Sequence, residues 1–257
     1  MTATVARPVL ARDGDRPAIL LLHALGADRR LWDPVTALLP GHAVLTYEFP
    51  GHGQAPVPEE PFTIHDLAER LAVAIRDGGW RPVHVVGVSL GGLVAQDMAA
   101  HHPDLVERLV LVDTVATYPV EQVARWHERA AIARSSGLAP LIDVTLQTWF
   151  PPGFLAADGP QVQLVRSMFA TTDPRGYALA CEALADTDTR ALAGRISAPT
   201  LVVCGDEDMP AFVDAARWFA ASIPRAELFW LSPARHMGIL EHPDQFATRL
   251  RAFLDNG

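Results

Sequence analysis

The sequence predicts an α/β fold in which a mostly parallel central sheet is flanked by helices on both faces and interrupted by a helical lid. Short continuous apolar runs, typical of strands buried on both faces, alternate with amphipathic helical stretches. Between residues 118 and 192 this alternation stops and only helical periodicity is found. We therefore expect a core of residues 1–117 and 193–257. The lid of residues 118–192 should cover the carboxyl edge of the sheet, where open α/β sheets bind ligands.

The expected strands are the buried apolar runs. They lie at residues 17–23, 43–49, 83–88, 109–113, 199–205 and 226–231. Residues 1–16 hold at most one short edge strand. Because the strands alternate with helices, short right-handed crossovers should make them parallel.

The core helices are indicated by apolar residues at helical spacing and by their end signals. A helix with apolar residues between 31 and 39 should end near Pro40, and Thr63 caps a helix over residues 64–77. A helix over residues 90–102 is closed by Pro103. Further core helices are expected at 211–223 and 239–254, and lid helices at 121–134, 138–149, 161–170 and 177–184.

Composition narrows the classes of partner. The 257 residues carry a net charge of −9 and no Lys/Arg run is longer than two, so we do not expect a nucleic-acid partner. No apolar segment is long enough for a signal peptide or a membrane span. The two cysteines, Cys181 and Cys204, do not indicate a disulfide framework, which fits a reducing cytoplasm. We expect a cytoplasmic protein that acts on a small molecule.

A G-x-S-x-G motif at residues 87–91 follows an apolar β-branched run and precedes a helical pattern. This context is typical of a nucleophile elbow, a sharp strand-to-helix turn that exposes its serine above the sheet. The glycines let the neighbouring backbone pass the strained serine without a clash. We therefore predict Ser89 as a nucleophile; the alternative is an ordinary turn that contains a serine.

A serine nucleophile needs a base and an orienting acid, which follow it in the chain order serine, acid, histidine. The turn at residues 206–208 follows a buried strand, and we favour Asp208 as the acid because it lies far enough past the strand to turn inward. Asp206 and Asp113 are the alternatives. His236, in the loop after the last strand, is the predicted base; His242, beside a proline, is the alternative.

The tetrahedral intermediate of acyl transfer needs two N–H donors. One should be the amide of Leu90, directly after the serine, and the other should come from the loop after the first central strand, at Leu25. We expect His23 and His52 to be structural residues that bond to loop backbone.

With these pieces in order, the chain resembles the α/β-hydrolase fold family over nearly its whole length, and the family's G-x-x-D spacing at residues 205–208 selects Asp208. It is closest to 3-oxoadipate enol-lactonases in three segments: residues 24–33, the lid run from 126 to 150, and residues 172–184. The resemblance implies an α/β-hydrolase fold, hydrolysis of a small cyclic enol ester, and neither cofactor nor metal. Glu48, where the family often has Asp, and a shortened segment at 209–212 depart from the pattern.

An enol-lactone substrate of this kind carries a carboxylate, so a cation should line the pocket. Arg134 and Arg166 are the lid candidates, with Arg129 behind them. The apolar wall would come from Trp126, Trp149, Phe150, Met168 and Tyr177, for each of which lid-helix packing is the alternative interpretation.

Other activities of the same fold are rival hypotheses. They are a general carboxylesterase, a carbon–carbon bond hydrolase and, outside enzymes, a ligand-sensing receptor. Epoxide hydrolases and dehalogenases are disfavoured because they place an aspartate where this chain has Ser89.

Overall fold

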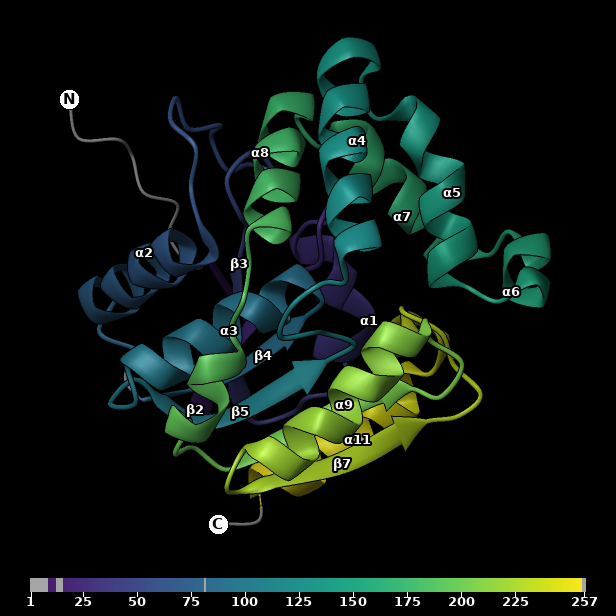
Figure 1. The fold of residues 1–257 in the computed structure, drawn as a ribbon. Helices are drawn as coiled ribbons and strands as arrows, with labels where there is room; N and C mark the ends of the chain where they lie inside the picture. The colour runs from purple at the N-terminus through teal and green to yellow at the C-terminus, as the bar shows by residue number, and fades with distance from the viewer. Residues whose placement is uncertain (1–8, 13–15, 81, 256–257) are drawn as a thin grey trace.

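The computed structural model describes residues 9–12, 16–80 and 82–255, and its centre is a seven-stranded sheet of order β1-β3-β2-β4-β5-β6-β7 (Figure 1). Six strands are parallel, and β1 at the edge pairs antiparallel with β3. The strands are β1 (Val9–Arg12), β2 (Arg16–Leu22), β3 (His42–Tyr47), β4 (Val83–Val88), β5 (Val106–Val112), β6 (Thr200–Gly205) and β7 (Ala226–Leu231). Every run predicted as a strand forms one. The short edge strand allowed for residues 1–16 is β1, whereas residues 1–8 and 13–15 lie outside the described residues.

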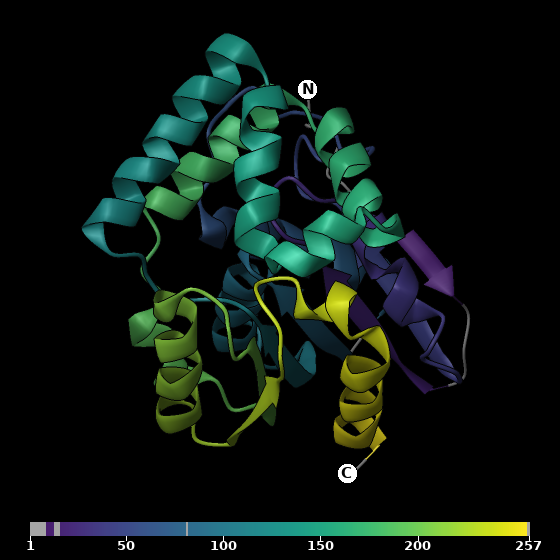
Figure 2. The same cartoon turned by 90° about the vertical axis from the view of Figure 1, so that its right-hand side faces the viewer.

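The sheet is buried on both faces, because β3, β4 and β6 are buried along their whole length. The core helices are α1 (Asp33–Thr36), α2 (Ile64–Asp77), α3 (Leu90–His101), α9 (Pro210–Ser222), α10 (Gly238–Glu241) and α11 (Pro243–Asp255). Figure 2 shows α9 and α11 on opposite sides of the sheet. This arrangement confirms the predicted fold class.

Two predicted core helices are broken. The helix expected over residues 31–39 is a 3-10 turn, η1 (Arg29–Trp32), followed by the single turn of α1. Pro34 has no N–H to donate to the Arg30 carbonyl, so the turn cannot continue as one α-helix. The helix expected over residues 239–254 is divided into α10 and α11, because Pro243 cannot donate to the carbonyl of Ile239.

Five helices are inserted between β5 and β6: α4 (Val120–Ser136), α5 (Ala139–Trp149), α6 (Pro152–Ala157), α7 (Pro160–Thr171) and α8 (Pro174–Ala185). They gather at one end of the molecule, at the top of Figure 1. A β-bridge between Thr117 and Asp188 joins the two ends of the insertion, and the 3-10 turn η2 (Arg190–Arg195) leads back to β6. Helix α6 was not predicted.

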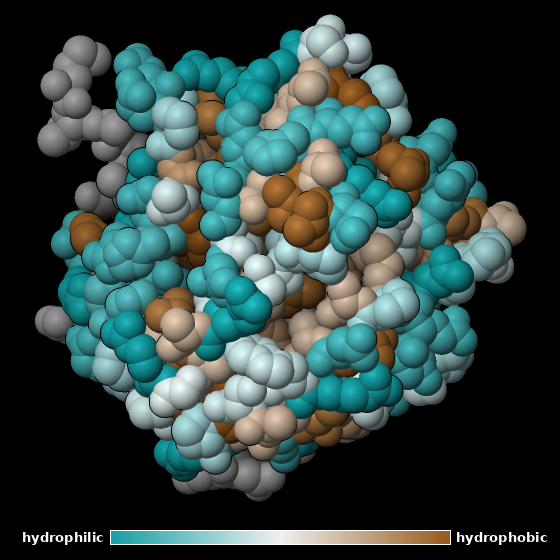
Figure 3. All heavy atoms as spheres, viewed as in Figure 1, coloured by the Kyte–Doolittle hydropathy of each residue, from teal (hydrophilic) through white to brown (hydrophobic). Residues whose placement is uncertain are grey.

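The surface seen in Figure 3 is mostly hydrophilic, with apolar residues in scattered groups. Within the described part of the chain, no helix combines the length and the apolar character that a membrane crossing requires.

Candidate active site

Ser89 lies at the turn between β4 and α3 with φ 54° and ψ −114°. Residues other than glycine rarely adopt this backbone conformation. The turn is possible because the residues two positions before and two positions after Ser89 are glycines. A Cβ at Gly87 would lie 2.2 Å from the Gly91 carbonyl oxygen, and one at Gly91 would lie 2.4 Å from the Leu22 carbonyl oxygen. The spacing of the motif therefore follows from backbone clearance.

A hydrogen-bonded chain of three side chains starts at this serine. His236 Nε2 lies 3.1 Å from Ser89 Oγ, and His236 Nδ1 lies 2.9 Å from Asp208 Oδ2. The other oxygen of Asp208 accepts a hydrogen bond from the Met209 N–H (2.7 Å). Both the Asp208 and the His236 side chains are almost fully buried. With Nδ1–H donating to the carboxylate, Nε2 is free to accept the serine proton.

The loops after β6 and β7 bring the acid and the histidine together. Asp208 ends the turn after β6, and His236 lies between β7 and α10. The ring of Phe212 meets the imidazole edge to face, with centroids 4.5 Å apart, and Trp149 lies 6.2 Å away on the insertion. These two rings pack against the imidazole and limit its rotation.

The alternative acids and the alternative base have other partners. Asp206 accepts hydrogen bonds from the Ser232 hydroxyl (2.5 Å) and the Ala234 N–H (3.2 Å), so it holds the loop that carries His236. His242 donates to the Pro233 carbonyl (2.7 Å).

Asp113 is buried at the end of β5, where its Oδ1 accepts from the Gly205 N–H (2.8 Å) and its Oδ2 has no partner. Burial and the nearby Asp208 carboxylate raise the pKa of Asp113 well above its usual value. The protonated form of Asp113 is thus favoured, and Asp208 is the carboxyl group that hydrogen-bonds with the imidazole.

The loop after β2 brings Leu25 to the same place. Leu90 opens α3, so its N–H has no carbonyl four residues earlier in the helix to bond with. His23 shapes the loop: its Nδ1 donates to the Ala24 carbonyl (2.8 Å) and its Nε2 accepts from the Phe49 N–H (3.0 Å). Burial lowers the pKa of His23 to about 3 and that of His52 to about 4, so both are neutral structural residues, as expected.

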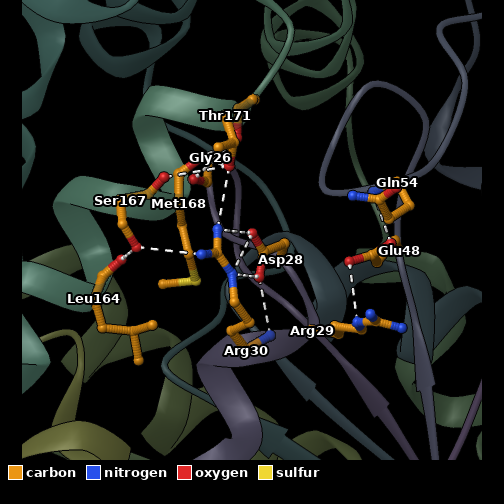
Figure 4. A network of polar contacts seen from close by, with 11 residues as sticks. Gly26, Asp28, Arg29, Arg30, Glu48, Gln54, Leu164, Ser167, Met168 and Thr171 are labelled. Atoms are coloured by element: carbon orange, nitrogen blue, oxygen red, sulfur yellow. Dashed lines mark hydrogen bonds and ion pairs between the residues drawn. The ribbon is translucent and has the colours of Figure 1, made fainter.

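Figure 4 shows how this loop is fastened to the inserted helices. Arg30 forms a two-pronged ion pair with the buried Asp28, with its NH2 2.6 Å from Oδ2 and its Nε 2.9 Å from Oδ1. The same guanidinium donates to Ser167 Oγ (3.4 Å) and Thr171 Oγ1 (3.1 Å) on α7. One arginine thereby joins the loop that carries Leu25 to the insertion.

A cavity of about 470 Å³ opens onto Ser89, His236 and Leu25. The inserted helices supply most of its wall, including the predicted residues Trp126, Trp149 and Tyr177. The full lining is Leu25, Ser89, Gln122, Arg125, Trp126, Glu128, Arg129, Ile132, Leu141, Val144, Thr145, Thr148, Trp149, Tyr177, Met209, Phe212 and His236.

Four residues expected in the pocket lie elsewhere. Arg134 pairs with Glu182 on the surface (2.6 Å) and Arg166 pairs with Asp143 (2.8 Å). Phe150 and Met168 are fully buried among apolar residues and are absent from the cavity lining. For these two candidates for the apolar wall, the structure favours the alternative interpretation of helix packing.

Arg125 and Arg129 both line the cavity; Arg125 is exposed, and Arg129 is the half-buried cation that bonds to other lining residues. Its guanidinium donates to Thr145 Oγ1 (2.7 Å) and to the hydroxyl of Tyr177 (2.9 Å from Nε). It lies over the rings of Trp126 and Tyr177, 5.9 and 5.7 Å from their centroids. None of the ion pairs among the described residues includes Arg129. The site thus presents a cation whose protein partners are all neutral.

Comparison with known proteins agrees with the fold described above. The sequence profile of the Alpha/beta hydrolase family matches residues 19–249. The 3-oxoadipate enol-lactonase 2 of Acinetobacter baylyi is 30% identical over 93% of this chain and 89% of its own length. A pimeloyl-[acyl-carrier protein] methyl ester esterase of Chromobacterium violaceum is 31% identical over 94% of this chain and 96% of its own length.

Solved structures agree with these matches. The enol-lactonase from Burkholderia xenovorans LB400 superposes with a TM-score of 0.90 at 32% identity, covering 98% of this chain and 96% of that one. A hydrolase from Pseudomonas aeruginosa superposes with a TM-score of 0.89 at 33% identity, covering 98% and 99% of the two chains.

Proposed function

This chain belongs to the alpha/beta hydrolase family, and from that premise we propose that it hydrolyses a small lactone or ester that carries a free carboxylate, through an acyl-enzyme on Ser89. The observation that carries the proposal is the arrangement of the cavity. Ser89 and His236, the second hydrogen-bonded to Asp208, line the cavity together with Arg129, whose hydrogen-bond partners are neutral groups. We take 3-oxoadipate enol-lactone as the first candidate substrate because enol-lactonases are among the relatives.

The proposed reaction begins when Ser89 Oγ attacks the lactone carbonyl and passes its proton to His236 Nε2. Asp208 stabilises the imidazolium that forms, and the N–H groups of Leu25 and Leu90 would bind the oxyanion. The ring C–O bond then breaks, and the enolate oxygen takes the proton from His236. The enol becomes a ketone, which makes the ring opening favourable. Water, deprotonated by His236, attacks the acyl-enzyme and releases the acid.

Arg129 is the proposed selector for the substrate carboxylate. A carboxylate would replace the neutral hydroxyls as its strongest acceptor, and a charge-assisted pair in a cavity is stronger than a neutral one. Trp126 and Tyr177 hold the guanidinium plane between them, so the cation needs little reorganisation on binding. The same arginine disfavours uncharged esters as preferred substrates.

The test uses two five-membered enol lactones, one carrying a carboxymethyl group (3-oxoadipate enol-lactone) and one carrying a methyl group in its place. We expect turnover of both, with the higher kcat/KM for the carboxylate. Arg129→Gln should lower kcat/KM by about 10- to 100-fold on the carboxylate substrate only, from the loss of a charge-assisted bond of about 1.5–3 kcal/mol. Arg134→Gln, which changes a surface arginine of the same helix, is the matched control.

Ser89→Ala should abolish both activities and the labelling of the protein by a fluorophosphonate. Wild-type activity in Ser89→Ala would refute the acyl-enzyme. Equal activity on the two lactones, unchanged by Arg129→Gln, would leave the hydrolase in place and refute the carboxylate preference.

A further inference from the structure

A second cluster of polar side chains lies outside the cavity, on the helices that cover one face of the sheet. His65 lies in the first turn of α2, and Asp97 and His101 lie on α3. Asp97 Oδ1 is 2.9 Å from His65 Nδ1 and 2.9 Å from His101 Nδ1, and one ligand atom from each residue lies within 4.8 Å of the other two. None of the three lines the active-site cavity.

The two helices present these groups for simple geometric reasons. Asp97 and His101 are four residues apart, so they share a face of α3. Helix α2 packs against α3 and brings the His65 ring to 4.9 Å from that of His101, at 66°. The Asp97 side chain is only 7% exposed whereas His65 is 52% exposed, so the cluster has a fixed, buried oxygen and an opening to solvent.

Two imidazole nitrogens converge on one carboxylate oxygen, which is the arrangement in which a metal ion can take the place of the bridging protons. We propose that His65 Nδ1, Asp97 Oδ1 and His101 Nδ1 bind a divalent transition-metal ion, with Zn²⁺ as the reference ion and water as the fourth ligand. Two imidazoles and a carboxylate suit Zn²⁺, Co²⁺, Ni²⁺ or Cu²⁺ better than Mg²⁺ or Ca²⁺, which prefer oxygen ligands.

The required movement is small. Zn–N and Zn–O bonds of about 2.0–2.1 Å place tetrahedral ligand atoms about 3.3 Å apart. The two separations of 2.9 Å to Asp97 Oδ1 therefore need to open by a few tenths of an ångström, and the two imidazole nitrogens, which lie within 4.8 Å of each other, adjust through the exposed His65 side chain. This site is distinct from the proposed hydrolytic chemistry. Its role is to fasten α2 to α3, the helix that begins directly after Ser89.

Two charged side chains beside the cluster, those of Glu69 and Arg195, have opposite effects on metal binding. Glu69 Oε1 lies 3.9 Å from His65 Nε2, where it can accept that N–H once the metal occupies Nδ1. Arg195 NH1 lies 3.3 Å from His101 Nε2, and because metal binding to Nδ1 makes Nε2 a donor, this exposed arginine must swing away. Arg195→Ala should accordingly tighten metal binding.

The experiment is a calorimetric titration of the tag-free full chain with Zn²⁺, together with Co²⁺ absorption, whose visible bands report a tetrahedral site. We expect one saturable site per chain and a rise in Tm with Zn²⁺. His65→Ala and His101→Ala should each remove the saturable Zn²⁺ binding, the visible Co²⁺ bands and the rise in Tm, and should leave esterase activity unchanged. His102→Ala and His127→Ala, which change a neighbouring and a distant histidine, should keep them. Absence of saturable binding by the wild type, or full binding by His65→Ala, would overturn the proposal.

Discussion

At the scale of single residues, Asp113, Asp206 and Asp208 are the three candidates for the acid, and Asp208 is the one that hydrogen-bonds with the His236 ring. Asp208→Asn should lower kcat by about 10⁴-fold, the order found when the acid of a Ser-His-Asp system becomes an amide, because the amide favours the wrong imidazole tautomer. Hydrolysis of the preferred lactone, measured beside circular dichroism to verify the fold, checks this.

Two matched variants test the assignment. Asp113→Asn should keep near wild-type kcat, because the protonated form of Asp113 is favoured. Asp206→Asn should lower kcat only a few-fold, since the amide oxygen can still accept from the Ala234 N–H and the amide NH2 can donate to the Ser232 hydroxyl. If Asp113→Asn were as inactive as Asp208→Asn, the acid would have been assigned to the wrong strand.

The order and spacing of residues were enough to predict the hydrogen-bonded side chains of Ser89, His236 and Asp208, but not which arginine lines the cavity. Ser89, Asp208 and His236 each follow a strand of the parallel sheet, and parallel strands end at one edge, so their proximity follows from topology. Which arginine of α4 reaches the cavity depends on its angular position around the helix. Arg134 is five residues beyond Arg129, which turns it by about 140° around α4 and away from the cavity. Trp126, three residues before Arg129 and on the same face, was the available signal.

At the scale of elements, the contact between the 3-10 turn η1 and α7 decides how firmly the loop of Leu25 is held. Arg30→Ala should reduce stability by about 1–3 kcal/mol, because it leaves the buried Asp28 carboxylate without its charged partner. It should also lower kcat more than it raises KM, because the loop then loses its attachment to Ser167 and Thr171.

Arg29→Ala is the matched control for this contact. Arg29 is exposed and lies 3.8 Å from Glu48, without the two-pronged geometry of its neighbour. Chemical denaturation and steady-state kinetics of the two variants give the comparison. Equal losses of stability and of kcat in the two variants would mean that positive charge near the loop matters in general, and that the specific Asp28–Arg30 contact does not.

Elements were predicted well where apolar runs are long and poorly where proline sets the boundary. The buried strands were all found because continuous β-branched runs fit a parallel sheet. Helix α6 was missed because Pro151-Pro152-Gly153 was interpreted only as a break, although Pro152 begins the helix at a position where its missing N–H costs nothing. The same property of Pro243 divides the last helix.

At the scale of the whole molecule, buried histidines make stability depend on pH. Burial lowers the pKa of His23 to about 3 and those of His52 and His84 to about 4, from 6.5. As the pH falls through 6.5 the unfolded chain binds three protons that the folded chain does not, so the free energy of unfolding decreases down to about pH 4. Each proton contributes about 1.4 kcal/mol per pH unit.

Asp113 has the opposite effect on the pH dependence of stability. Its raised pKa favours the protonated form in the folded state, whereas the same carboxyl group is ionised in the unfolded chain at this pH. For these four groups together the net difference is about two protons, so they contribute a fall in the free energy of unfolding of about 3 kcal/mol for each pH unit between pH 6 and pH 5. Denaturant unfolding at closely spaced pH values measures this slope.

Two substitutions should change the slope in opposite senses. His84→Gln removes one proton from the unfolded state's uptake and should make the slope shallower by about 1.4 kcal/mol per pH unit. Asp113→Asn removes the opposing proton and should make it steeper by the same amount. His127→Gln, at an exposed position of α4, should leave it unchanged. A slope that Asp113→Asn does not steepen would show that Asp113 is ionised in the folded protein, which would contradict the raised pKa that follows from its burial beside Asp208.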